Sequence, residues 1–391
     1  MNEVFMSRQP LVNRQSRIIA TRLLLHLGNG ASMLDGVGTL SALAGVWPQG
    51  EKPVFVGCCP GGGEAGLLDW LAPENATLEL SAPTLLGEQG ADLIAALQAF
   101  QPSVCLHFEP QAAQALSTGV KLRFIGFDAR RFNLSQLKLL ATRTRSCGIG
   151  IAFNVETTDD FRACLDAGLG AAAGWFFTAP AGSPAKALNP GQANIVRVLN
   201  LVRKNADIRE IEAALKLDVA ISYKLLRYIN SAGFGLSCEI QSFRHAVNML
   251  GYEKLNRWLS LLLGSASKDP MAPALMHTAL LRARLIELLA SGLVDKSEYD
   301  NLFITGAFSL LDALLGVAME QALEAMRLPE PISDALLGNG GRYQPFLDLA
   351  LASEGDDGAA IAEQAAMLGL TAEQFNRAQL QALSFADAME L

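Results

Sequence analysis

Four polar side chains follow predicted strands and are candidates for chemistry. They are Glu79, His107, Glu109 and Asp128. In a parallel sheet the carboxyl ends of the strands meet at one edge, and three carboxylates with one imidazole could bind a single metal ion there. The alternative is that these side chains are hydrogen-bonded polar residues of the sheet edge that hold no ligand. We favour this second interpretation.

The cysteine and histidine residues do not form a recognisable zinc motif. The six cysteines include the adjacent pair Cys58 and Cys59 but no C-x-x-C pair, and the four histidines include no H-x-x-x-H. Structural zinc sites need several such ligands at short spacings. We therefore expect no metal or other cofactor, and we expect reduced cysteines in a cytoplasmic protein.

Composition excludes several classes of protein. Half of the 391 residues are hydrophobic, 18% are charged and the formal net charge is −8, so global disorder is excluded. An acidic chain without a basic run lacks the usual charge pattern for binding nucleic acid or an anionic membrane surface. The most apolar stretch, Leu302–Met319, has Asp312 at its middle. We interpret it as a buried helix rather than a membrane span. The amino-terminal residues show no secretory signal.

Short β-rich runs alternate with helix-like segments over residues 50–180. Such alternation at a repeat of about 21–26 residues indicates βαβ units and a parallel sheet. With one further strand near the start, seven strands favour an incomplete (β/α) barrel, and an open doubly wound sheet is the alternative. The expected strands are Arg17–Leu25, Pro53–Val56, Thr77–Leu80, Ser103–Phe108, Phe124–Phe127, Ile149–Phe153 and Ala172–Phe177.

The pattern changes after a segment rich in Pro, Gly, Ala and Ser, Ala179–Gly191. Amphipathic helical segments follow, among them one long segment, Asn301–Met326. Thr371 and Gln374 have the spacing of a capping box before the last helix. We therefore expect a barrel over residues 1–182, a linker over 183–191 and an all-helical domain over 192–391.

The helical half resembles HDOD domains. Asp218–Gly235, DVAISYKLLRYINSAGFG, is similar to the family signature, and Ile240–Gly251, IQSFRHAVNMLG, is similar to the element that follows it. Phe303–Leu315 and Ile332–Leu337 resemble the helices that follow when an HDOD domain stands behind a modified EAL domain. The resemblance covers nearly all of residues 195–391.

The first half resembles, in eroded form, the EAL domain, a cyclic di-GMP phosphodiesterase fold. Arg8-Gln9-Pro10 is similar to the opening of that family, and Val155-Glu156-Thr157 with Gly174-Trp175-Phe176-Phe177 is similar to its ending. The resemblance implies a modified TIM-like barrel followed by an HDOD domain, as in EAL–HDOD signalling proteins.

Most residues that would carry the EAL chemistry are replaced. Hydrolysis of cyclic di-GMP needs divalent metals held by several carboxylates at the strand ends. When the family's metal-ligand positions are carried over onto this sequence, Glu79 is the one that still holds a metal-binding residue. The replaced positions hold Arg22, Gly57, His107, Phe108, Gly126, Phe153 and Ala173, while Asp128 and Glu156 remain. The helical half also lacks the adjacent His-Asp pair of metal-dependent HD hydrolases. The sequence therefore predicts no catalytic residues and no metal site.

These observations favour a catalytically inactive scaffold or regulator in cyclic di-GMP-related signalling, with protein partners on the HDOD half and possible homo-oligomers. The first alternative is a sensor that binds cyclic di-GMP or another nucleotide without hydrolysis. Its ligand-binding candidates are Arg22, Glu79, His107 and Asp128. Arg22 would then face phosphate, whereas without a ligand it would form a salt bridge. The second alternative is a residual metal-dependent phosphodiesterase. Nucleic acid and membranes are not expected as partners.

Overall fold

The computed structural model describes most of the chain. The described residues are 3–28, 30–59, 64–109, 111–179, 188, 190–216, 251–252, 254–257, 259–260, 267, 269–326 and 328–389. The segment Asp218–Gly235, nearly all of Ile240–Gly251 and most of the expected linker 183–191 lie outside them. The contacts divide the chain into two compact units. A barrel unit holds residues 1–177 and 351–377, and a helical unit holds residues 178–350 and 378–391.

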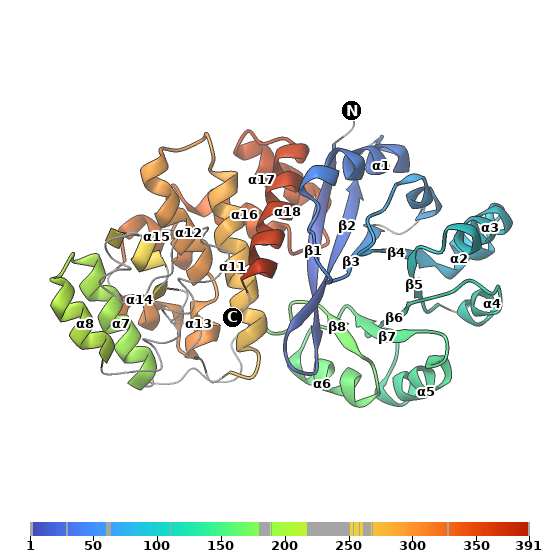
Figure 1. Cartoon of the computed structure of the whole chain (residues 1–391), viewed down its shortest axis with the longest axis horizontal. Helices are drawn as coiled ribbons and strands as arrows, with labels where there is room; N and C mark the ends of the chain where they lie inside the picture. Colours follow the sequence, from blue (N-terminus) through green and yellow to red (C-terminus); the bar gives the residue numbers. More distant parts are fainter. Residues whose placement is uncertain are drawn as a thin grey trace. The chain divides into compact units, whose positions relative to one another are not determined.

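Eight strands close into a barrel (Figure 1). Seven of them lie where the sequence predicts strands, and neighbours from β2 to β8 pair in parallel. The eighth, β1, is antiparallel to both β2 and β8, and it closes the ring. The barrel is therefore modified, as expected, but it is not incomplete. The strands are β1 (Val4–Asn13), β2 (Ile18–Leu27), β3 (Val54–Cys59), β4 (Ala76–Ser81), β5 (Ser103–His107), β6 (Phe124–Asp128), β7 (Ile149–Phe153) and β8 (Ala171–Ala173).

β1 was not predicted as a strand, because its centre is polar. Ser7, Arg8 and Gln9 interrupt the apolar run, yet all three are buried and have partners inside the unit. The turn into β2 is stabilised by Asn13, whose side-chain oxygen accepts from the backbone N–H groups of Gln15 and Arg17. Such Asx turns favour the tight reversal that an antiparallel pair requires.

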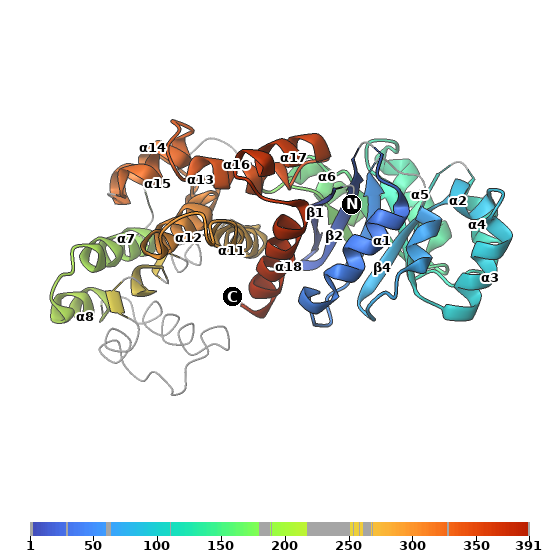
Figure 2. The ribbon, with the colours of Figure 1, turned by 90° about the horizontal axis from the view of Figure 1, so that it is seen from above.

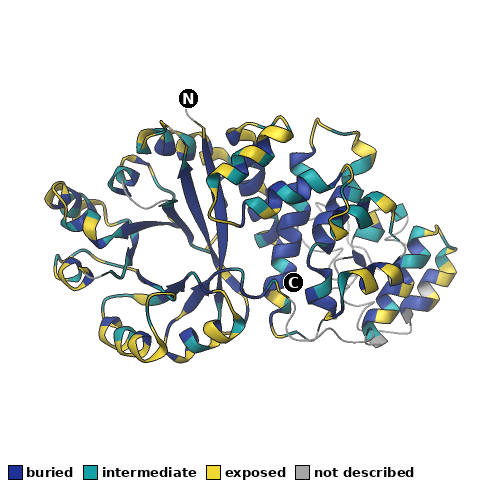
Figure 3. Cartoon of the chain, turned by 180° about the vertical axis from the view of Figure 1, so that it is seen from behind, coloured by how far each residue is buried: buried dark blue, intermediate teal, exposed yellow. Residues whose placement is uncertain are grey.

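Helices cover the outside of the barrel, and their outer faces are exposed (Figures 2 and 3). Capping side chains begin several of them. Asn133 with Gln136 forms a capping box at α5, for example, and the Thr157 hydroxyl accepts from the Asp160 amide at α6. The helical segments of this unit are α1 (Met33–Ala42), η1 (Ala44–Val46), η2 (Glu64–Asp69), α2 (Ala82–Leu86), α3 (Gly90–Phe100), α4 (Ala112–Leu116), α5 (Leu134–Thr144), α6 (Thr158–Asp166) and α17 (Gly358–Met367).

The interior of the barrel is filled with side chains. Its apolar cluster takes residues from seven of the strands, which leaves a packed core rather than a channel. The cluster consists of Leu11, Ala20, Phe55, Cys105, Phe124, Ile151, Phe153 and Ala173.

Residues 351–377 belong to the barrel unit, although the sequence places them in the helical half. The Arg8 amide donates to the carbonyl of Ser353, and α17 packs against β1. The buried Asn376 side chain accepts from the Met6 amide and donates to the Val4 carbonyl. These bonds satisfy backbone groups on the outer side of β1, so the helical segment supplies part of the barrel's cover.

The described part of the helical unit contains helices and no strand, as the sequence predicts. The capping box at Thr371 and Gln374 forms at the start of the last helix, α18. α16 and α18 each have residues in both units. The helical segments are α7 (Pro190–Arg203), α8 (Ile208–Lys216), α11 (Ala272–Leu289), η4 (Lys296–Glu298), α12 (Tyr299–Phe308), α13 (Leu311–Leu315), α14 (Met319–Met326), α15 (Glu330–Leu337), α16 (Gln344–Ala352) and α18 (Ala372–Ala388).

The single helix expected over Asn301–Met326 is wrong, because three helices occupy that span. The first break follows α12 at Ser309, and the second follows α13 at Gly316, which has a left-handed φ of 67°. α12 and α13 are buried, in agreement with the expected buried segment. At Gly306 a Cβ would lie 2.5 Å from the Cα of Ala283, so glycine permits the close packing of α11 on α12.

Among the described residues no helix is long and apolar enough to cross a membrane.

Candidate functional site

Three of the four candidate ligand-binding residues meet inside the barrel. Arg22 on β2, Glu79 on β4 and His107 on β5 lie on the inward-facing rows of their strands. Alternation along each strand brings every second side chain to the same face, so parallel neighbours in register align their inward residues. β3 separates β2 from β4 and contributes Gly57 to the same region.

Glu79 binds both basic neighbours. The Arg22 guanidinium donates from Nε to Oε1 over 2.7 Å and from Nη2 to Oε2 over 2.8 Å. His107 Nε2 lies 2.9 Å from Oε2, and Arg22 Nη1 donates to the side-chain oxygen of Gln9 over 3.1 Å. This two-point geometry is the strongest form of an arginine–carboxylate pair. The salt-bridge alternative for Arg22 is therefore the one that the structure has.

The ring of Phe153 packs under this cluster. The guanidinium carbon of Arg22 lies 4.4 Å from the ring centroid, and the His107 ring stacks on Phe153 with centroids 5.1 Å apart. A Cβ at Gly126 would lie 2.2 Å from a carbon of this ring, and a Cβ at Gly57 would lie 2.7 Å from Glu79 Oε2. The residues that replace the family's expected ligands therefore fit one another: the two glycines leave the room that Phe153 and Glu79 occupy.

Electrostatics keep the cluster charged. Burial alone would raise the pKa of Glu79, but the Arg22 charge and the hydrogen bond from His107 lower it to about 2. Burial would lower the pKa of Arg22, and Glu79 raises it above its ordinary value. Burial, with Glu79 beside it, raises the pKa of the Cys105 thiol. Glu79 is thus an ionised carboxylate already neutralised by a cation of its own chain.

Asp128 belongs to a separate set of ion pairs, with Arg130 and Arg131. Its carboxylate accepts from the Arg130 amide over 3.0 Å and pairs with the Arg131 guanidinium at 3.4 Å. Burial would raise its pKa, but hydrogen bonds from Arg130 and Asn154 lower it. Glu109 pairs with Arg131 at 3.9 Å. Within the described ranges, no three His, Cys, Asp or Glu side chains are placed to hold a metal ion.

A loop between α16 and α17 lies at the mouth of the barrel beside the Arg22 cluster. Gln9 Nε2 donates to Asp356 Oδ1 over 3.2 Å, and the Cys59 thiol lies 3.7 Å from the Asp356 carbonyl. A Cβ at Gly358 would lie 2.5 Å from the Cβ of His26. Burial lowers the pKa of His26, while Asp356 and Asp357 oppose that shift. These contacts could not be predicted from the sequence, because 297 positions separate Cys59 from Asp356, 347 separate Gln9 from it, and no motif marks the loop.

A pocket of about 300 Å³ lies between this loop and the ends of β7 and β8. Its polar lining combines three carboxylates with one arginine, and the indole of Trp175 lines it as well. The charged and amide residues are Gln9, Arg130, Asn154, Glu156, Glu354 and Asp356. Glu354 is engaged by Arg8 over 2.7 Å in a buried pair.

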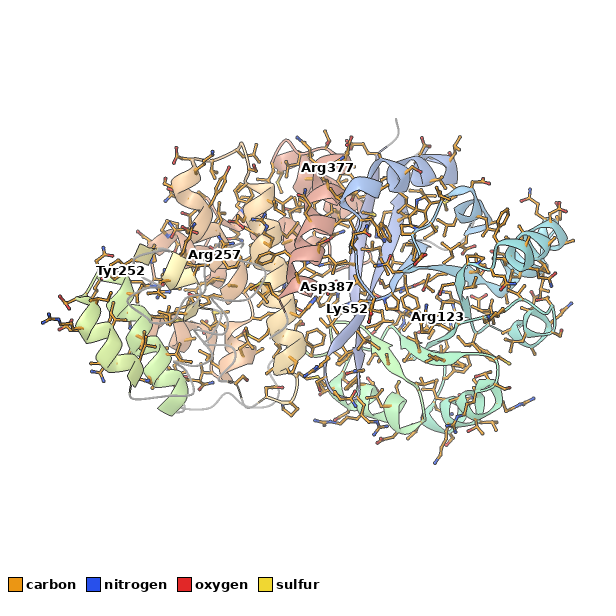
Figure 4. The ribbon with its side chains drawn as sticks, viewed as in Figure 1. Lys52, Arg123, Tyr252, Arg257, Arg377 and Asp387 are labelled. Carbon is orange, nitrogen blue, oxygen red and sulfur yellow. The ribbon has the colours of Figure 1, made fainter. Side chains whose placement is uncertain are left out.

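The helical unit has polar clusters of its own. Arg257, labelled in Figure 4, donates to both oxygens of Glu287 over 2.8 and 3.0 Å and lies 3.4 Å from the centroid of Phe303. Arg284 also binds Glu287. His277 lies 2.9 Å from Asp387, a pairing across 110 positions that has no sequence signal. Of the histidines expected in this half, His245 lies outside the described residues.

A family model confirms the predicted identity of the helical half. It matches residues 190–325 and describes an HDOD domain. This chain contains an HDOD domain. The matched residues begin with α7 and end within α14. The HDOD domain behind a closed, modified barrel supports the EAL–HDOD architecture that the motifs suggested.

Two curated proteins are similar to part of the chain. The cyclic di-GMP phosphodiesterase CdgJ of Vibrio cholerae is 30% identical over 233 residues, which are 59% of this chain and 54% of CdgJ. The uncharacterized protein YuxH of Bacillus subtilis is 28% identical over 209 residues, which are 51% of this chain and 50% of YuxH. The chain thus spans about half the length of these relatives.

Solved EAL structures are also similar to this chain. The FimX EAL domain from Pseudomonas aeruginosa, bound to c-di-GMP, is 18% identical with a TM-score of 0.35, over 46% of this chain and 90% of that domain. A TM-score of 0.35 is too low to assign a function.

Proposed function

We propose that this chain is a regulator in cyclic di-GMP-related signalling whose barrel does not hydrolyse the dinucleotide and which acts by binding another protein. The observation that supports this most strongly is the pairing of Glu79 with Arg22 and His107. The HDOD domain and the similarity to CdgJ support the signalling context.

The Arg22 guanidinium binds Glu79 where a metal ion would need to bind it. Hard divalent metals require several oxygen ligands around one point. At Glu79 both carboxylate oxygens are occupied, and the Arg22 charge repels a second cation. Releasing the carboxylate would break a buried ion pair, which costs about 3–5 kcal/mol when one partner is left unpaired.

The charges at the barrel mouth also oppose an anionic ligand. Cyclic di-GMP carries two phosphate groups. Arg8 neutralises Glu354, which leaves Glu156 and Asp356 in the mouth pocket against a single lining arginine, Arg130. Like charges at short range disfavour association. This arrangement favours the regulator over the sensor.

The proposal places the partner surface on the HDOD half. Among the described residues of the helical unit, the exposed large hydrophobic side chains are Leu293 and Leu337, at 45% and 37% exposure. Exposed apolar side chains mark candidate contact points when they lie on a shared surface. A truncation at residue 192 would remove the strands that α17 and Asn376 contact, so the full chain is the proper object for tests.

Hydrolysis is the second candidate, because CdgJ is named as a phosphodiesterase. Titration calorimetry of the full chain with cyclic di-GMP, with and without Mn²⁺, separates the candidates. The proposal expects no binding heat in either condition. Binding without metal would support the sensor, and binding that requires Mn²⁺ and is lost in Glu79→Gln would support the enzyme. Asp159→Asn, an exposed change at the start of α6, is the matched control.

The partner contact is tested separately by affinity capture with the full chain, followed by mass spectrometry. The proposal expects Leu337→Glu to abolish capture of a defined protein that wild type retains. Leu71→Glu, an exposed substitution in the barrel unit, should leave capture unchanged. Loss in the Leu71 variant alone would place the contact on the barrel instead.

A further inference from the structure

A pocket of about 490 Å³ opens at the end of the barrel opposite to Glu79. Arg123 directly precedes β6, Ile149 begins β7 and Gly170 directly precedes β8, so the pocket lies at the amino ends of these strands. The carboxyl-terminal part of α5 and the loop after it close one side with Arg145 and Cys147. Arg123, labelled in Figure 4, lies beside β6. The volume is within the range of small-ligand sites.

The pocket is basic in an acidic protein. Between residues 110 and 155 the chain carries seven basic side chains and one acidic side chain, whereas the whole chain carries a net charge of −8. Two of the seven, Arg130 and Arg131, pair with Asp128. Arg123 and Arg145 line the pocket and form no ion pair with any described residue. Arg123 packs instead over the ring of Phe124, 5.4 Å from its centroid.

The lining determines the kind of ligand. It contains two guanidinium groups, the Ser146 hydroxyl and glycine backbone, but no carboxylate and no aromatic side chain. Guanidinium groups bind phosphate oxygens in pairs and remain charged at every physiological pH. Without an aromatic face in the pocket, a nucleobase would have nothing to stack upon.

We propose that this pocket binds a small phosphorylated ligand through Arg123 and Arg145. The site is distinct from the mouth of the barrel, and it stands whether or not the barrel hydrolyses cyclic di-GMP. Both arginines are exposed at the surface, so a phosphate can reach them without rearrangement of the strands.

The test uses inorganic pyrophosphate as the probe and the full chain. Titration calorimetry should show saturable binding, and Arg123→Ala or Arg145→Ala should each weaken it about tenfold, the loss expected for one charge-assisted hydrogen bond. Arg143→Ala is the matched control, because Arg143 precedes Arg145 by two residues, carries the same charge and does not line the pocket. It should change affinity little.

Cys147 gives a second readout inside the pocket. Pyrophosphate should slow its alkylation by iodoacetamide, measured by peptide mass spectrometry, and Arg145→Ala should remove that protection. Cys59, at the other end of the barrel, is the internal reference. No saturable binding, equal weakening by Arg143→Ala, or unprotected Cys147 in the wild type would each overturn the proposal.

Discussion

A buried arginine–glutamate pair in the barrel and a half-buried one in the helical unit are built alike and differ in setting. Arg22 with Glu79 in the barrel and Arg257 with Glu287 in the helical unit are both two-point pairs. Each guanidinium lies against a phenylalanine ring, at 4.4 Å in the barrel and 3.4 Å in the helical unit.

The settings differ in what else is available to the arginine. Arg257 also donates to Asp300 over 3.3 Å, and Glu287 has a second partner in Arg284. Arg22 has Glu79 as its ion-pair partner and a neutral amide, Gln9, as its other partner. In the helical unit both Arg257 and Glu287 have a second oppositely charged partner. In the barrel, the ion pair of Arg22 depends on the single carboxylate of Glu79. Glu79, the one expected metal ligand that is kept, is therefore held by a structural partner, Arg22.

The largest effect is expected from removing the barrel carboxylate. Glu79→Gln should cost about 3–5 kcal/mol of unfolding free energy, because it leaves the buried Arg22 charge uncompensated. Glu287→Gln should cost less, since Arg257 keeps Asp300. Urea unfolding followed by tryptophan fluorescence reports mainly the barrel, which holds three of the four tryptophans, Trp47, Trp70 and Trp175. Hydrogen exchange of α11 reports the helical unit.

A double replacement sharpens this comparison. Arg22→Met combined with Glu79→Leu should recover most of the stability lost in Glu79→Gln, since replacing both partners by apolar groups avoids the unpaired charge. A cost in Glu79→Gln no greater than that of the exposed control Asp159→Asn would show that the pair is not structural.

An intermediate effect is expected at the glycine that makes room for Phe153. Gly126→Ala should destabilise the barrel by about 1–3 kcal/mol, because the new Cβ would overlap the ring under Arg22 and His107. Phe153→Leu in the same chain should relieve part of that cost. Gly38→Ala, in α1 with no atom within 4 Å of the new Cβ, is the control and should be neutral or stabilising. Additive costs in the double variant would contradict the contact.

The smallest effect is a pH dependence at the mouth loop. Burial lowers the pKa of His26 in the folded barrel below its ordinary 6.5. The unfolded chain therefore binds the proton first, and stability falls as pH drops below about 6.5, by at most about 1.4 kcal/mol per pH unit. His26→Gln should lose less stability than wild type between pH 7 and pH 5.5 in urea unfolding. Identical pH profiles would show that the loop does not bury this ring.

The sequence predicted the barrel well where its strands are apolar and parallel. Seven strand positions followed from the alternation of β-rich and helical runs. Of the replaced ligand positions, Arg22, Gly57, His107, Gly126 and Phe153 lie together around Glu79, whereas Phe108 packs against another cluster. The closing strand β1 was missed because its central Arg8 is buried through partners far along the chain, Ser353 and Glu354. The break at Gly316 was missed because apolar residues on both sides resemble one continuous helix.

The sequence predicted which residues form the candidate site, but it did not predict the ion pairs and hydrogen bonds between them. Arg22, Glu79 and His107 could be placed at strand ends from their motifs. Their mutual pairing depends on Gly57 and Gly126, whose missing side chains leave space that no local pattern reveals. The loop at Asp356 reaches β1 only through the tertiary fold, so no local signal predicted its position at the barrel mouth.

We propose that the Arg22–Glu79–His107 cluster replaces metal chemistry in the barrel. The most direct test is an assay of cyclic di-GMP hydrolysis by the purified full chain with Mg²⁺ or Mn²⁺, with linear dinucleotide measured by anion-exchange chromatography. We expect no product above the protein-free control. Product that forms in proportion to the protein, and that disappears in Glu79→Gln but persists in Asp159→Asn, would contradict it.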